Sequence, residues 1–154
     1  MKPHLSILVL SAIAGASTAR GAESLCTSLR EFVSSVKPGE TREFTFHTSW
    51  GGDFKDSSDQ AIYAKRCNDG GYVPAQKVCD YLMEHGAVEF AGNNVNEALS
   101  CLSPRTRFAP SLGLQRASFS LPIGTQDRGS LVELEFYEDP EIGGMAFKVS
   151  ADGY

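Results

Sequence analysis

The residues best able to do chemistry in this chain are its four cysteines, Cys26, Cys67, Cys79 and Cys101. An even number of widely spaced cysteines without a C-x-x-C pair indicates two disulfides rather than a zinc site. Cysteines that are paired supply no thiolate nucleophile. Four cysteines allow three pairings, so a choice among them needs the elements that carry them.

Two expected helices favour one of these pairings. Hydrophobic periodicity predicts helices over residues 74–85 and 95–102, joined by a Gly-Asn-Asn turn. If they form an antiparallel hairpin, Cys79 and Cys101 lie at equal distances from the connection and therefore at the same height. We expect a Cys79–Cys101 disulfide, which leaves Cys26–Cys67 as the second bridge.

The candidate acids and bases are few. His47 falls on the polar face of an expected strand, and His85 falls in the last turn of a helix, where its partial positive charge is favourable. Glu133 and Glu135 share the outer face of another strand and could act as an acid–base pair, although such pairs are more often solvated. No nucleophile elbow, zincin, phosphate-binding or dinucleotide motif is present. We therefore expect no catalytic residue, metal or cofactor.

Two loops have the composition of binding surfaces. The first carries the only tryptophan beside glycines, charges and a second aromatic ring, which is typical of an interface or a sugar-stacking platform. The second is polar and longer than a tight turn requires. The candidate binding residues are Trp50, Asp53, Phe54 and Lys55 in the first loop, and Thr125, Gln126, Asp127 and Arg128 in the second. Alternatively, Trp50 completes the buried face of its strand, and the second loop is an ordinary hairpin connection.

The remaining elements follow from periodicity. Helical spacing predicts a helix over residues 24–36, and Ser57 with Gln60 resembles a capping box for a helix that ends near Cys67. Asn94 is a candidate cap for the last helix. Alternation predicts strands over residues 41–50, 117–121, 132–136 and 145–149. This order predicts an α+β fold, with an antiparallel sheet of about four strands and helices on one face.

The first residues have the layout of a secretory signal peptide. A basic start, an apolar run over residues 5–13 and small residues over 14–19 follow one another. We expect cleavage after Ala19, with Ala16 and Ala22 as alternatives. The rest, residues 20–154, has the size of one exported domain.

The sequence does not predict a membrane anchor. The apolar run is shorter than a bilayer requires, and no later stretch is long and apolar enough. No small residue precedes Cys26, so a lipid anchor is not expected. We predict a periplasmic or secreted protein without membrane insertion.

The charge balance bears on partners. Lysine and arginine number 14 and aspartate and glutamate 19, which gives a net charge of −5. An acidic chain disfavours nucleic acid and anionic membranes and favours a basic partner. We expect a non-catalytic binding protein, such as an inhibitor or immunity-type protein that blocks a basic cell-wall-lytic enzyme or toxin. The alternatives are an envelope accessory protein that binds a glycan or small ligand, and a small hydrolase that uses carboxylates or His47.

Overall fold

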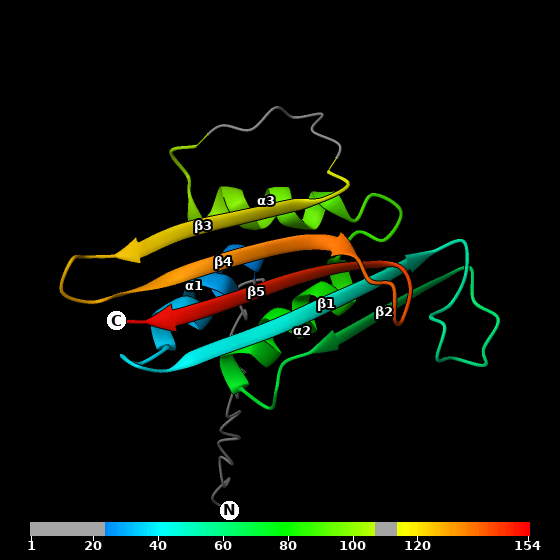
Figure 1. Ribbon diagram of the computed structural model, residues 1–154, viewed down its shortest axis with the longest axis horizontal. Coiled ribbons are helices and arrows are strands. Elements are labelled where there is room, and N and C mark those ends of the chain that lie inside the picture. The colour runs from blue at the N-terminus through cyan, green and yellow to red at the C-terminus, as the bar shows by residue number, and fades with distance from the viewer. Residues whose placement is uncertain (1–23, 107–113) are drawn as a thin grey trace, which may run out of the picture.

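The computed structural model describes residues 24–106 and 114–154, in which three helices cover one face of a five-stranded sheet (Figure 1). The elements in chain order are α1 (Leu25–Ser35), β1 (Thr41–Trp50), β2 (Tyr63–Asn68), α2 (Val73–His85), α3 (Gly92–Leu102), β3 (Ala117–Gly124), β4 (Gly129–Glu138) and β5 (Met145–Gly153). The strand order is β2-β1-β5-β4-β3, and all neighbours are antiparallel. The expected α+β fold is confirmed, with five strands instead of about four. The expected signal peptide and residues 107–113 lie outside the described residues.

The additional strand is β2, which replaces the helix expected between Ser57 and Cys67. Ser57 does not cap a helix: its hydroxyl donates to Asp53 at 2.8 Å and accepts from the Asp59 amide at 3.1 Å, within a turn. Residues 63–68 pair with the edge of β1, from Trp50↔Tyr63 to Thr45↔Asn68. The capping-box spacing was therefore misleading, because a short helix is marginal by itself, whereas a strand at this place pairs with the open edge of β1 and brings Cys67 to Cys79.

The core lies between the helices and the inner face of the sheet. Phe44 and Phe46 of β1 are 1% and 0% exposed, as the alternation predicted. α2 packs on β1 and β2, whereas α1 and α3 pack on β4. Gly86, which follows α2, approaches the sheet so closely that an added Cβ would lie 2.8 Å from the Phe46 ring. Glycine is therefore required at this position because a side chain would clash with the sheet, and not because of its backbone conformation.

The starts of α1 and α3 are held by different hydrogen bonds, and the cap expected for α3 is wrong. Ser24 caps α1, because its hydroxyl accepts from the Thr27 amide at 3.3 Å. Asn94 does not cap α3, which begins at Gly92. Instead, the buried Asn94 amide bonds both the N–H and the carbonyl of Ala87 at 2.8 Å. Asn94 thus holds the connection between α2 and α3 in place.

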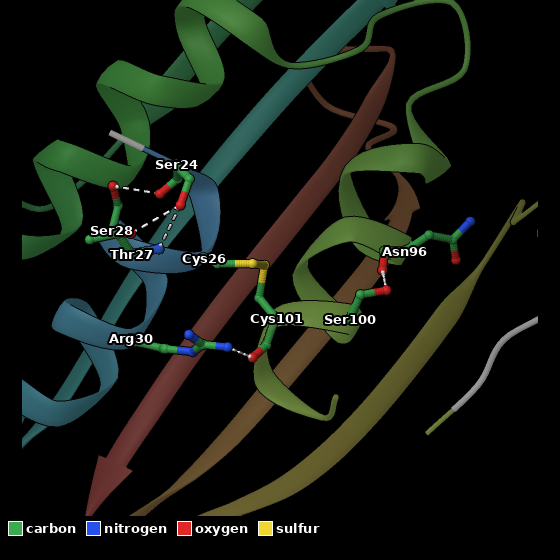
Figure 2. Close-up of a disulfide and its surroundings, with 8 residues drawn as sticks. All are labelled: Ser24, Cys26, Thr27, Ser28, Arg30, Asn96, Ser100 and Cys101. Carbon is green, nitrogen blue, oxygen red and sulfur yellow. Dashed lines mark hydrogen bonds between the residues drawn. A yellow bond between two sulfur atoms is a disulfide. The ribbon is translucent and has the colours of Figure 1, made fainter. Parts of the chain in front are cut away.

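Two disulfides are present, but their pairing differs from the expected one. The bridges are Cys26–Cys101 and Cys67–Cys79, with Cα atoms 4.9 and 5.5 Å apart. The expected Cys79–Cys101 and Cys26–Cys67 pairs are wrong because α2 and α3 do not form a packed hairpin. Both helices pack against α1 instead. Figure 2 shows the bridge from Cys26 on α1 to Cys101 on α3.

The second bridge depends on the strand that sequence periodicity missed. Cys67 lies opposite Phe46 in the register of β1 and β2, so it shares the helix-facing side of the sheet. α2 packs against β2 on that side and presents Cys79. A helix over residues 57–67 would not have placed Cys67 beside Cys79.

The outer face of the sheet is not covered by helices (Figure 1). Glu133 and Glu135 are exposed on it, as predicted. Lys148 of β5 pairs with Glu43 at 2.7 Å, and this hydrogen bond raises the pKa of Lys148 above its ordinary value. Within residues 24–106 and 114–154, no helix is long and apolar enough to cross a bilayer.

Candidate functional sites

The two loops singled out from the sequence lie at opposite ends of the sheet (Figure 1). The segment 51–62 follows the end of β1, whereas residues 125–128 connect β3 to β4. The structure therefore does not bring the two groups of candidate residues into one site. Each end must be considered separately.

Most candidate residues of the first loop hold the loop itself. Asp53 accepts hydrogen bonds from the Phe54 amide at 2.7 Å and the Ser57 hydroxyl at 2.8 Å. Lys55 donates its ammonium to the Pro140 carbonyl at 2.8 Å, which ties the loop to the β4–β5 connection. Because these groups already have partners, they are less available to a second molecule.

Phe54 is a buried residue of the outer face rather than an exposed aromatic. Its side chain is 4% exposed and lies edge-on to His47, with ring centroids 6.4 Å apart. The Arg66 guanidinium stacks on Phe54 at 4.7 Å and is itself held by Asp56 through two hydrogen bonds of 2.7 and 2.9 Å. The hydrogen bond from Arg66 also lowers the pKa of Asp56. This stack closes the loop over the sheet.

Trp50 differs from these neighbours because it is 56% exposed. Its position on the inner face follows the predicted alternation, but the side chain is exposed, so the alternative that Trp50 completes the buried face of its strand is wrong. Its register partner Tyr63 is also 56% exposed and lies on the same face. Phe90, from the connection between α2 and α3, is 67% exposed.

Trp50 and Phe90 line a depression of about 640 Å³ that we call the aromatic groove. It lies between the end of β1, the α2–α3 connection and the adjoining ends of β4 and β5. Glu89 and Glu138 also line it, and neither forms an ion pair within the described part of the chain. The described residues that line the groove include no lysine or arginine. The groove thus combines aromatic surface with unpaired negative charge.

The second loop is a compact hairpin. The Thr125 amide donates to the Arg128 carbonyl at 2.9 Å, and the Arg128 amide donates back to the Thr125 hydroxyl at 3.3 Å. Gln126 and Asp127 are exposed at its tip. Thr125 and Arg128 line a different cavity, at the end of the sheet away from Trp50.

His47 forms the nearest approach to a catalytic pair. Its Nε2 lies 3.2 Å from a carboxylate oxygen of Asp139, and the two side chains are 12% and 17% exposed. Its Nδ1 is buried and has no hydrogen-bond partner among the described residues. The His47–Asp139 pair thus links β1 to the β4–β5 connection, with the Phe54 ring packed edge-on beside it.

Asp139 also organises that connection. Its Oδ1 accepts from the amides of Glu141 and Ile142 at 2.9 and 3.2 Å. Partial burial favours the neutral carboxyl, but these two hydrogen bonds and His47 outweigh it. Together they hold the pKa of Asp139 below its ordinary value of 3.8.

Sequence reasoning found Trp50 but missed the residues around it. The sequence predicts a helix at Tyr63 and only a Gly-Asn-Asn turn between α2 and α3, and neither pattern connects Glu89 or Phe90 with Trp50. The available signal in the sequence was Glu89 beside Phe90, an aromatic residue next to a carboxylate in a short connection. Only the fold shows that both lie beside the end of β1.

Comparison of the chain with protein-family models, curated proteins and solved structures found no match.

Proposed function

We propose that this protein is an exported, non-catalytic binding protein whose partner is a basic protein. The observation that carries the proposal is the aromatic groove, where exposed Trp50 and Phe90 lie with Glu89 and Glu138. Two disulfides are typical of a chain that folds in an oxidising compartment, which is consistent with export.

The chemistry of the groove favours a lysine or arginine side chain from the partner. An aromatic ring attracts a cation over its face, and a carboxylate forms a charge-assisted hydrogen bond with the same group. Exposed aromatic side chains are also the residues that most often dominate the free energy of protein association. The net charge of −5 adds long-range attraction toward a basic surface.

Basic cell-wall-lytic enzymes and toxins are proteins of this kind. In that role the protein would act as an inhibitor or immunity-type protein, with a basic loop of the enzyme seated in the groove. Such a complex is stoichiometric and requires no turnover by this chain. Its association rate should fall as the ionic strength rises.

The test compares groove variants with a charge-matched control. The oxidised protein captures a partner from the native exported fraction, and the partner is then purified and titrated by calorimetry. We expect Trp50→Ala, and separately Glu89→Gln/Glu138→Gln, to weaken binding at least about tenfold. Glu133→Gln/Glu135→Gln removes the same charge from the outer face and should change affinity less than about twofold.

The control decides between the groove and the outer face. Equal losses in the two double variants would show that net charge alone governs binding and would overturn the assignment to the groove. If the purified candidate forms no stoichiometric complex, the proposal that the partner is a basic protein is overturned.

A glycan ligand is the second candidate, because an exposed tryptophan at a groove can also stack on a sugar. Since Trp50 is the only tryptophan, its fluorescence reports directly on the groove. A saturable change in emission with an oligosaccharide, without any protein partner, would favour this envelope-accessory role. A hydrolase would instead turn over substrate and lose that activity in His47→Ala while remaining folded.

A further inference from the structure

A second cavity, of about 510 Å³, lies at the end of the sheet opposite the aromatic groove. It is enclosed by α1 and the residue that follows it, the last residue of α3, and the β3–β4 hairpin. Its floor is apolar and consists of Val33, Val36, Leu102 and Ile123. The first three of these side chains are between 3% and 8% exposed, so the floor is part of the hydrophobic core.

The rim of this cavity carries positive charge. Arg30 of α1 and Arg128 of the hairpin both line it, and the described lining residues include no aspartate or glutamate. Neither guanidinium lies within ion-pair distance of a carboxylate among the described residues. In a chain with net charge −5, two arginines without acidic partners beside one apolar cavity form a local positive site.

One of the arginines is fixed in place. Nη2 of Arg30 donates to the carbonyl of Cys101 at 3.2 Å, as Figure 2 shows. The disulfide between Cys26 and Cys101 fixes the distance between the helices that carry the two groups. The Arg30 side chain has therefore lost part of its conformational entropy already in the free protein, so binding a ligand requires less additional ordering.

We propose that this cavity binds a single-chain anionic amphiphile of the fatty-carboxylate class. Guanidinium groups recognise carboxylates through paired hydrogen bonds, so Arg30 and Arg128 would hold the headgroup at the rim. The hydrocarbon chain would lie on the apolar floor. An apolar pocket of several hundred Å³ with a few oriented polar groups is the usual form of a small-ligand site.

This site does not depend on the proposed function. The cavity and the aromatic groove share no lining residue among those described. Variants of one site can therefore leave the other intact, and the two proposals can fail separately.

The test uses decyl probes that differ in headgroup charge. Decanoate, decyl maltoside and decyltrimethylammonium are titrated by calorimetry, each below its critical micelle concentration, into the oxidised protein. We expect decanoate to bind with one-to-one stoichiometry and at least about tenfold more tightly than the cationic probe, because only its headgroup complements the arginines.

The matched variants are Arg128→Gln and Arg116→Gln, which remove the same charge at opposite ends of β3. We expect Arg128→Gln, and separately Arg30→Gln, to weaken decanoate binding about tenfold while changing decyl maltoside binding less than about twofold. Arg116→Gln should leave both affinities unchanged. Thr125→Trp, which places a bulky side chain at the exposed mouth, should weaken both probes.

Several results would overturn the proposal. These are the absence of saturable decanoate binding, equal affinity for the anionic and cationic probes, and equal effects of Arg128→Gln and Arg116→Gln. Circular dichroism and a melting curve of each variant establish that a loss of binding is not a loss of fold.

Discussion

At the scale of single residues, Asp139 shows how side chains that could do chemistry instead hold loops. Its carboxylate accepts two backbone hydrogen bonds within its own turn and contacts His47 on β1. Asp53 and Lys55 have comparable roles in the neighbouring loop. The sequence singles out His47, Asp53 and Lys55 by residue type, but residue type alone does not distinguish a reactive group from one whose hydrogen bonds are already made within the fold.

Replacing Asp139 with asparagine tests this role through its pH dependence. The folded-state pKa is lowered, so the ionised carboxylate stabilises the fold above pH 3.8, and this contribution is lost as the pH falls through the lower, folded-state value. We expect Asp139→Asn to lower the free energy of unfolding by roughly 1 kcal/mol at pH 7. In urea titrations, this difference from the wild type should shrink below pH 3.8.

The neighbouring Glu138→Gln is the control for that experiment, because Glu138 is exposed and forms no ion pair among the described residues. Its free energy of unfolding should differ little from the wild type at any pH. A wild type and Asp139→Asn that differ by the same amount at pH 7 and pH 2.5 would contradict the assigned role of the charge.

Phe46 tests the register of β1. Its side chain is fully buried between the sheet and the segment at Gly86. Phe46→Ala should lower the free energy of unfolding by about 3–5 kcal/mol, because it removes buried surface and leaves a cavity. Glu133→Ala, on the outer face, should change it by less than about 0.5 kcal/mol. A cost below about 1 kcal/mol for Phe46→Ala would mean that the strand register is shifted by one residue.

At the scale of elements, β2 explains the main differences from the expected fold. The spacing of Ser57 and Gln60 matches a helix start, yet the chain forms a turn there and then pairs with β1. Strand pairing is a non-local interaction, so a window of neighbouring residues does not contain it. Once β2 is placed, Cys67 faces α2, and the disulfide pattern follows.

The two bridges should contribute unequally to stability. They separate cysteines by 75 and 12 residues, and a longer closed loop restricts the unfolded chain more. On the chain-entropy account, Cys26→Ala/Cys101→Ala should cost about 1.5 kcal/mol more than Cys67→Ala/Cys79→Ala. Chemical unfolding of the two double variants measures this difference.

Peptide mapping without reduction checks the pairing itself. The expected linked peptides contain Cys26 with Cys101 and Cys67 with Cys79. Detection of a Cys79–Cys101 peptide as the main species would contradict the structure and restore the hairpin arrangement of α2 and α3.

At the scale of the whole molecule, two surfaces of opposite character lie at the two ends of the sheet. The aromatic groove at one end carries two carboxylates, whereas the cavity at the other end carries two arginines. The overall charge of −5 describes neither surface. The disulfides cross-link the helices that lie between these two surfaces. One joins α1 to α3, and the other joins α2 to β2 of the sheet.

Reduction should therefore destabilise the whole fold. We expect the melting temperature to fall by at least about 5 °C when both bridges are reduced, since each contributes a few kcal/mol. A thiol assay on the unfolded sample must count four free thiols, which establishes that reduction is complete. An unchanged melting curve under those conditions would contradict a stabilising role for the bridges.

The local and periodic features of this protein follow from its amino-acid sequence alone. Alternation placed Phe44 and Phe46 on the buried face, and helical spacing located α1 and α2, because these patterns repeat within a few residues. The cysteine count determined the number of disulfides. The pairing of the cysteines, the position of β2 and the exposure of Trp50 became visible only in the folded structure. Each depends on which distant segments pack together, and local spacing carries no information about those distances.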